Sequence, residues 1–420
     1  MCCKKKMVII AGNCFPVGDA NGNLIIQCAN YLKEIYDIKI ICIREEFKDI
    51  IGEKRQEFQV YTLGQLRLSL AEVSEKKYKE CNKAANKSIW LLTNFFFRGL
   101  GKIESLFFTI DNRWWYQKKA YKLLEKIYDL EKIDSVLSLN DPIEAHIAAY
   151  KFKQKHNEVK WISYWADLYA CKVNKLNLFV SLKRLMKLER KLLSASDEIM
   201  STVEVKRTLK KRYPDIENKI MDIPYTIRKL NIVKSEKHKQ NNNIDFIYAG
   251  TFYKDIRNPE FLLKVFMELP SNYRLHLFAA GNCQNIIDFY KKKMKDRLIE
   301  HAQLPLNDLT KYILNEGDFL INIENNISTS NPSKLYDLLS YNKPIIDFCY
   351  FSSQREALGK FPAAISIMIN SDIEQTVLSI KKFVDSTRCY DVDTFSKNIE
   401  LYFKDNLENN IRKKVIEVCK

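Results

Sequence analysis

The stretch INIENNISTSNPSKLYDLLSYNKPII, residues 321–346, runs from an apolar strand through a polar loop into a helix. Pro332 and Ser333 open the expected helix, Lys334 stands in its first turn, and Asp337 follows one turn later. Proline suits a first helical turn because it has no N–H to leave unpaired, and serine can cap the helix. The free amides and Lys334 would then face one anion. The pattern indicates a pyrophosphate site, with an ordinary capped helix as the open alternative.

Short β-branched runs alternate with longer amphipathic stretches along the chain, which is the pattern of βαβ units around a parallel sheet. In the first half, strands are expected at residues 7–11, 39–43, 135–139, 160–164 and 198–202. In the second half they are expected at residues 245–249, 274–279, 298–303, 319–323 and 344–348. The sequence therefore predicts an α/β protein with two Rossmann-like domains that face a ligand cleft, since parallel sheets bind ligands at the carboxyl ends of their strands.

The domain boundaries follow from composition. We expect a first domain over residues 1–227 and a second, nucleotide-binding domain over residues 244–391. Residues 228–243, RKLNIVKSEKHKQNNN, are poor in apolar residues and end in an asparagine run, as expected of a linker. Residues 392–420 show a helical pattern that could cross back to the first domain.

Composition and charge exclude several classes of protein. Of 420 residues, 46% are hydrophobic and 29% charged, so neither a disordered chain nor a collagen-like fibre fits. The 68 Lys and Arg residues exceed the 52 Asp and Glu residues, and the net charge of +16 would attract phosphates, nucleic acid or an anionic membrane surface. A nucleic-acid-binding protein is a distant alternative, because no RNA- or DNA-binding signature is present and the bases are spread along amphipathic helices.

The eleven cysteines are odd in number and never spaced C-x-x-C, which argues against a disulfide framework and a zinc site. Four histidines, His156, His238, His276 and His301, are not grouped with carboxylates in the sequence, so we expect no metal site. No cofactor is expected either. The apolar run at residues 7–10 is too short for a signal peptide, and residues 89–110 contain Arg98, Lys102 and Glu104. A cytoplasmic protein without a membrane-spanning helix is predicted.

A glycine-containing loop, AGNCFPVGDANGN, follows the first expected strand at residues 11–23. Gly18 and Gly22 directly precede a helix start, where glycines let backbone N–H groups approach an anion closely. The loop is neither a dinucleotide fingerprint nor a Walker P-loop. A plain strand-to-helix turn stays an open alternative.

Several segments together resemble GT-B glycosyltransferases of the retaining family-4-like group. PSKLYDLLSYNKPII (residues 332–346), FIYAGTFYKDIRNPEFLLKVF (246–266) and LHLFAAGN (275–282) resemble that group's carboxyl-terminal half, and residues 7–34 resemble its first strand, glycine loop and helix. The similarity covers nearly the whole chain in order. It implies transfer of a sugar from a nucleotide-diphosphate sugar to a lipid-linked or saccharide acceptor, in cell-surface polysaccharide or glycolipid synthesis.

The resemblance implies donor-binding roles for eight residues: Gly18, Gly22, Gly250, Lys254, Arg257, Ser333, Lys334 and Asp337. Lys254 and Arg257, after Gly250, match the family's basic pair that grips the donor diphosphate. Asp337 matches the acid that holds the nucleotide ribose, and Gly18 and Gly22 would face the donor phosphates from the other domain. Because cations and amides would stabilise the leaving diphosphate, we expect a metal-independent enzyme.

One departure from the family concerns an acid. The family commonly has two acids eight positions apart, and eight positions before Asp337 stands Thr329. The missing acid contacts the donor sugar in the family, so the sugar and the stereochemical outcome stay open. A nucleotide-sugar 2-epimerase of the same fold and a catalytically inactive GT-B scaffold are the alternatives.

Asp167 is the candidate catalytic residue. It follows an expected central strand in WISYWADLYA, residues 161–170, where family members present a polar or acidic side chain. A carboxylate there could orient an acceptor hydroxyl or act as a base. A structural aspartate bonded to loop amides is the alternative. His146, on the apolar face of an expected helix, is interpreted as a semi-buried structural residue.

Residues 172–191 contain seven bases and one acid. Leu178, Leu182, Leu185 and Met186 would form one face of a helix there, which fits peripheral contact with an anionic inner membrane face. A solvated helix that packs on the core fits equally well.

Overall fold

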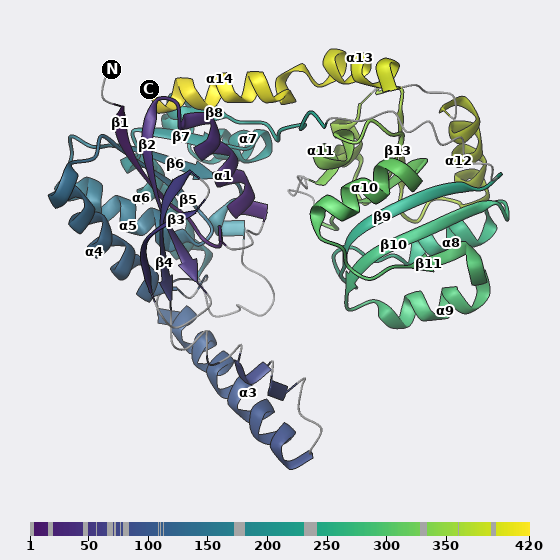
Figure 1. Cartoon of the computed structure of the whole chain (residues 1–420), viewed down its shortest axis with the longest axis horizontal. Coiled ribbons are helices and arrows are strands. Elements are labelled where there is room, and N and C mark those ends of the chain that lie inside the picture. Colours follow the sequence, from purple (N-terminus) through teal and green to yellow (C-terminus); the bar gives the residue numbers. More distant parts are fainter. Residues whose placement is uncertain are drawn as a thin grey trace. The chain divides into compact units, whose positions relative to one another are not determined.

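The computed structural model describes most of the chain and divides it into two compact units (Figure 1). Unit 1 comprises Met1–Pro224 and Arg412–Lys420, and unit 2 comprises Tyr225–Ile411. The described residues are 4–15, 20–44, 49–55, 57–64, 70, 73–75, 77–78, 84–107, 109, 111, 113–171, 181–230, 242–327, 334–359, 361–387 and 392–420.

The described residues of unit 1 form one eight-stranded sheet in the order β3-β4-β2-β1-β5-β6-β7-β8. Its strands are β1 (Lys5–Ile10), β2 (Tyr36–Arg44), β3 (Ile50–Arg55), β4 (Phe58–Gly64), β5 (Ser135–Leu139), β6 (Lys160–Trp165), β7 (Glu198–Ser201) and β8 (Ile220–Asp222). All neighbouring strands are parallel except β3 and β4, which are antiparallel. In the central strand β1, Val8, Ile9 and Ile10 are fully buried, as expected of a strand covered on both faces.

The helices of unit 1 are α1 (Ala20–Leu32), α3 (Ala84–Phe107), α4 (Trp114–Glu131), α5 (Ile143–Lys155), α6 (Leu182–Ala195), α7 (Val203–Arg212) and the end of α14 (Glu408–Cys419). A core cluster joins residues of β1 and β2 to residues of α4, α5, α6 and α7. The last residues of α14 are bonded to unit 1: Tyr36 Oη donates to the Cys419 carbonyl at 2.5 Å, and Lys160 Nζ donates to the Val418 carbonyl at 2.9 Å.

The described residues of unit 2 form a six-stranded, all-parallel sheet in the order β11-β10-β9-β12-β13-β14. Its strands are β9 (Ile244–Phe252), β10 (Tyr273–Gly281), β11 (Leu298–Glu300), β12 (Phe319–Ile323), β13 (Ile345–Cys349) and β14 (Ala364–Met368). Its helices are α8 (Glu260–Glu268), α9 (Gln284–Met294), α10 (Leu306–Glu316), α11 (Lys334–Leu339), α12 (Ile373–Thr387) and α13 (Val392–Tyr402).

Both faces of the unit 2 sheet are covered by helices. Phe246 and Tyr248 of β9 belong to a core cluster with residues of α8, α9 and α12, whereas Ile247 between them belongs to a second cluster with residues of α10, α11 and α13. Alternate side chains of one strand therefore serve opposite faces, as the two-residue period of a strand requires.

The ten strands predicted from the sequence are all present, and the predicted fold class is confirmed. The strands β3, β4, β8 and β14 were not expected. In β3, a glycine and three charged residues interrupt the apolar pattern, and β8 is only three residues long. The pattern at residues 392–420 forms two helices, α13 and α14, instead of one. No described helix combines the length and apolar character needed to cross a bilayer.

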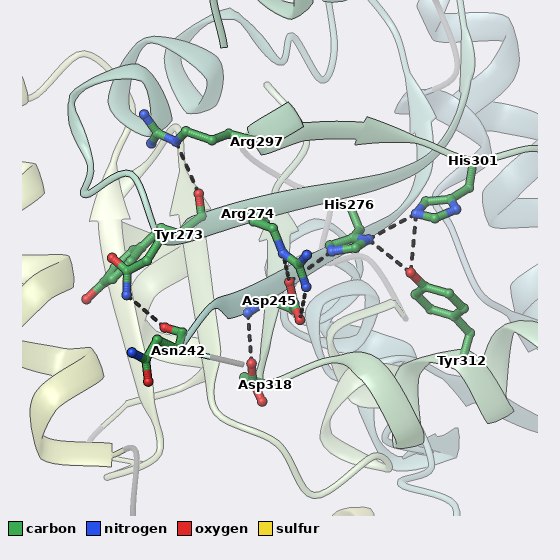
Figure 2. A network of polar contacts seen from close by, with 10 residues as sticks. Asn242, Asp245, Tyr273, Arg274, His276, Arg297, His301, Tyr312 and Asp318 are labelled. Atoms are coloured by element: carbon green, nitrogen blue, oxygen red, sulfur yellow. Dashed lines mark hydrogen bonds and ion pairs between the residues drawn. The ribbon is translucent and has the colours of Figure 1, made fainter. Parts of the chain in front are cut away.

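A buried polar network lies near the beginnings of β9 and β10 (Figure 2). The Asp245 carboxylate accepts hydrogen bonds from Arg274 Nε at 2.7 Å and Arg274 Nη2 at 2.8 Å, and lies 3.0 Å from His276 Nε2. His276 Nδ1 lies 3.0 Å from both His301 Nε2 and Tyr312 Oη. Burial, and then the neighbouring His276, lower the pKa of His301. The network joins β9 and β10 to residues after β11 and in α10, at the end of the sheet away from the usual ligand edge.

Candidate functional site

Three polar side chains, Lys334, Arg257 and Glu324, lie close together at the carboxyl ends of β9 and β12. Lys334, the first residue of α11, places its Nζ 4.2 Å from the centre of the Tyr248 ring. A Cβ atom at Gly250 would lie 2.1 Å from that Nζ. Only a glycine lets the lysine lie so close to β9. Arg257 follows β9, and its Nη2 donates to Asn325 Oδ1 at 2.8 Å.

The cationic groups of this cluster have unused hydrogen-bonding capacity. Lys334 is half-buried as a residue, but its Nζ is shielded from solvent and has no hydrogen-bond partner among the described residues. The same is true of Arg257 Nε. Burial, and then the charge of Arg257, lower the pKa of Lys334 to about 7. An anion in contact with both groups would raise the pKa of Lys334 again, because a nearby negative charge favours the charged form of lysine.

An acid completes the cluster. Glu324, directly after β12, is fully buried. Its Oε1 accepts from Asn322 Nδ2 at 2.9 Å, while its Oε2 has no partner among the described residues. Asn322 Nδ2 also donates to Asp347 Oδ1 at 2.8 Å. Burial, and then the charge of Asp347, raise the pKa of Glu324, and burial raises the pKa of Asp347. Arg257 and Lys334 act in the opposite direction on Glu324, so the two cations and this acid interact electrostatically.

In unit 1, Asp167 lies just after the carboxyl end of β6, and its side chain is exposed. Asn140, just after β5, donates from Nδ2 to the carbonyl oxygen of Asp167 and accepts at Oδ1 from the Ala166 N–H at 3.1 Å. Asn140 thus holds this loop through two main-chain groups, the Asp167 carbonyl and the Ala166 N–H.

No protein-family model and no curated protein sequence matches the chain. Solved structures match it over its whole length. The lipopolysaccharide outer core galactosyltransferase WaaB, in its apo form, has a TM-score of 0.61 at 12% identity and covers 99% of this chain and 99% of its own. An α,α-trehalose-phosphate synthase (UDP-forming) from Burkholderia vietnamiensis has a TM-score of 0.62 at 10% identity, with coverage of 99% and 100%. A glycosyltransferase from Rickettsia africae ESF-5 has a TM-score of 0.57 at 13% identity, with coverage of 99% and 99%.

The fold is that of GT-B glycosyltransferases. At these sequence identities the structural similarity establishes only the fold, and it does not identify the donor or the acceptor of this chain. Within the GT-B fold, the Lys334 cluster of unit 2 occupies the carboxyl edge of a parallel sheet, where such sheets bind ligands.

The sequence-predicted donor residues of this GT-B protein do not all gather in one place. Gly250, Arg257 and Lys334 lie together in the cluster. Lys254 is exposed, and its backbone N–H donates to Asn282 Oδ1 at 3.0 Å. The partly exposed Asp337 pairs with Arg228 Nη2 at 2.8 Å, although it is also close enough to favour the charged form of Lys334. Gly18 and Ser333, like Thr329, lie outside the described residues.

Gly22 has a structural explanation in the first GT-B unit. It lies in the first turn of α1, and a Cβ atom there would lie 1.9 Å from the carbonyl oxygen of Asn13. The close approach of α1 to the loop after β1 therefore requires a glycine. Its contact with donor phosphates stays a prediction.

Two buried acids, Glu324 and Glu144, were given no role from the sequence. Glu324 was visible as a polar residue directly after an apolar strand, but nothing local showed that it would be buried beside Lys334. Glu144, in the first turn of α5, is fully buried and accepts from Thr109 Oγ1 and from the Arg113 N–H at 2.8 Å. Burial, and then Asp111, raise the pKa of Glu144 to about 7. Both acids could hold or release a proton near neutral pH.

His146 is fully buried, with Nδ1 2.7 Å from Ser138 Oγ and its ring 4.6 Å from the Trp165 ring. His146 was expected to be a semi-buried structural residue, and its contacts fit a structural role, although it is fully buried. Among the described residues, no group of three or more Asp, Glu, His or Cys side chains is placed to hold a metal ion.

Proposed function

We propose that this chain is a glycosyltransferase that transfers a sugar from a nucleotide-diphosphate sugar to a saccharide or lipid-linked acceptor. The observation that carries the proposal is a pair of solvent-shielded cationic donors, Lys334 Nζ and Arg257 Nε, which have no hydrogen-bond partner in the described part of the chain and lie at the ligand edge of the unit 2 sheet. A diphosphate presents several acceptor oxygens to such donors. Negative charge grows on the diphosphate as the sugar leaves, so the two cations would stabilise the transition state more than the bound donor.

Glu324 is proposed to bind the donor sugar in place of the acid missing at Thr329. Its Oε2 is buried and has no partner within the described ranges, the two cations act on its carboxyl group, and a sugar hydroxyl could donate to it. Asp337 is proposed to contact the nucleotide ribose, with Lys254, Ser333, Gly18 and Gly22 as further donor contacts. The trehalose-phosphate synthase (UDP-forming) among the similar structures makes UDP-sugars the first donors to test.

The experiment for the activity is incubation with a panel of UDP-sugars and saccharide acceptors, with and without EDTA. UDP release together with a heavier acceptor supports the proposal, and the activity is expected to survive EDTA. A free isomerised sugar would identify a 2-epimerase instead. Bound UDP without turnover of any donor would indicate an inactive scaffold.

Binding of a nucleoside diphosphate is expected to take up a proton at about pH 8, where a lysine with a pKa of about 7 is mostly neutral. The bound anion favours the charged form of Lys334, raises its pKa and draws in close to one proton. Calorimetric titration of UDP in buffers of different ionisation enthalpy measures this uptake. The uptake should vanish in Lys334→Met, and heats that do not depend on the buffer in the native protein would contradict the mechanism.

Asp167→Asn is expected to lower kcat by about a hundredfold or more, because a carboxylate that orients or deprotonates the acceptor hydroxyl would be lost. Calorimetry should show unchanged UDP affinity, since Asp167 is not among the proposed donor contacts. An exposed acid of the same unit, Asp129→Asn, is the control and should leave both quantities unaltered. A normal kcat in Asp167→Asn would contradict the catalytic role and support the alternative from the sequence, a structural role for Asp167.

A further inference from the structure

The surplus of positive charge belongs almost entirely to unit 1. Its residues include 44 Lys and Arg against 29 Asp and Glu, a net charge of +15, while unit 2 has 24 against 23, a net charge of +1. The long-range field of the protein therefore attracts anions to unit 1. The charged residues of the proposed donor site all lie in unit 2, so donor binding does not account for this asymmetry.

Unit 1 also carries an amphipathic helix with an exposed apolar face. In α3, Ile89, Leu92, Phe95 and Phe96 are 58%, 68%, 77% and 60% exposed. Their spacing of three, six and seven residues places them along one side of the helix. Figure 1 shows α3 extending beyond the edge of the unit 1 sheet. Such a face normally packs against the core of a globular protein, and a large exposed apolar patch marks an interaction site.

The sequence of α3 and of the residues just before it is rich in bases. Residues 76–102 contain seven Lys or Arg and one Glu. Lys77 Nζ lies 4.6 Å from the centre of the Trp90 ring, and Lys87 of α3 is exposed. Bulky apolar side chains on one face, with bases and a tryptophan nearby, characterise helices that lie in the interface of an anionic bilayer.

We propose that α3 inserts the side chains of Ile89, Leu92, Phe95 and Phe96 into the interface of a bilayer with anionic headgroups, with the helix in the plane of the membrane. Apolar insertion holds the helix, and the +15 charge of unit 1 supplies long-range attraction to the lipid headgroups.

The basic helix α6, predicted as the membrane contact, has a different role. Leu185, Leu192 and Leu193 of α6 are buried in the unit 1 core, so these side chains cannot insert into lipid. Lys183 and Arg184 are exposed and add to the positive field. Of the predicted face, Leu178 lies outside the described residues, Leu185 is buried, Met186 is half-buried and Leu182 is 52% exposed. The described part of α6 therefore offers less exposed apolar surface than α3 does.

A bilayer fits the α3 face better than two other partners. A second copy of the chain would bring two units of +15 charge together, and their repulsion opposes self-association. Nucleic acid would neutralise the positive charge of unit 1. Proteins bind it through basic side chains and stacked aromatic rings, however, and aliphatic side chains such as Ile89 and Leu92 would add little affinity.

The test is sedimentation of the full chain with vesicles of phosphatidylcholine alone or mixed with phosphatidylglycerol, at low and high salt. The native protein should bind the anionic vesicles at low salt, more weakly at high salt, and brominated acyl chains should quench Trp90 fluorescence. The triple variant Leu92→Gln, Phe95→Gln, Phe96→Gln should bind about tenfold more weakly or worse, since binding scales with inserted apolar area. A matched control replaces the similarly exposed Leu130, Phe289 and Leu401 with glutamine and should bind normally.

Three outcomes would overturn the proposal. The first is that the triple variant sediments like the native protein, which would show that α3 is not the lipid contact. The native protein could ignore anionic vesicles but form dimers that the triple variant abolishes, which would make α3 a contact between copies. It could also bind oligonucleotides while it ignores vesicles. UDP affinity should be the same in the triple variant, so the outcome is independent of the proposed donor site.

Discussion

Lys334→Met is expected to weaken nucleoside-diphosphate binding by about 1.5–3 kcal/mol, the value of a charge-assisted hydrogen bond. This corresponds to a roughly 10- to 150-fold increase in Kd, measured by calorimetric titration of UDP. The reason is geometric: Lys334 Nζ is shielded from solvent, has no partner among the described residues and lies with Arg257 at the carboxyl edge of the sheet. Methionine keeps the length and apolar stem of the side chain but cannot donate.

The same variant should be at least as stable as the native protein. A lysine with a folded-state pKa of about 7 instead of 10.5 lowers stability at every pH below 10.5, and the cost is complete below about pH 7. Methionine removes this cost, so the variant's gain in unfolding free energy should grow as the pH falls from 10.5 to 7. Urea denaturation across this range measures it.

The matched control is Lys264→Met in α8. Lys264 is exposed and pairs with Glu260 at 2.9 Å, a surface contact that contributes little. UDP affinity and stability should both stay near native values. Normal UDP affinity in Lys334→Met would remove the diphosphate role of Lys334, whereas a loss of affinity in both variants would point to a general effect of positive charge.

Arg274→Met is expected to lower the unfolding free energy by about 3 kcal/mol, because it leaves the buried carboxylate of Asp245 without its bidentate partner. The value lies at the low end of the range for broken buried pairs. Arg274 is partly exposed, and His276 Nε2 stays 3.0 Å from the carboxylate (Figure 2). Urea denaturation monitored by circular dichroism measures the loss.

Two further variants separate the buried charge from lost packing. Adding Asp245→Asn to Arg274→Met removes the unpaired charge and should restore much of the stability. Arg190→Met removes an exposed Arg–Asp pair, 3.0 Å from Asp215, and should change the unfolding free energy by about 1 kcal/mol or less. Equal losses in Arg274→Met and Arg190→Met would show that burial of Asp245 has no special cost.

Local sequence determined the fold class. Apolar β-branched runs such as residues 319–323 form buried strands because both faces of a central parallel strand are covered, and amphipathic segments between them form helices. Strands with weaker patterns escaped prediction. The three-residue β8 is too short for a two-residue period to show, and β3 alternates exposed and half-buried side chains with a glycine between them.

The candidate site depended on tertiary structure. From local sequence, Lys334 was expected in the first turn of a helix and Arg257 in a loop after a distant strand. The fold brings them together and shields Lys334 Nζ, and this burial lowers the pKa of Lys334. The same holds for Glu324, whose position after a strand was visible but whose burial was not. For α3, sequence shows an amphipathic pattern, whereas only the packing of unit 1 decides that the face with Phe95 is turned to solvent. Periodicity is a local property of the chain, but burial and charge proximity depend on segments that are distant in sequence.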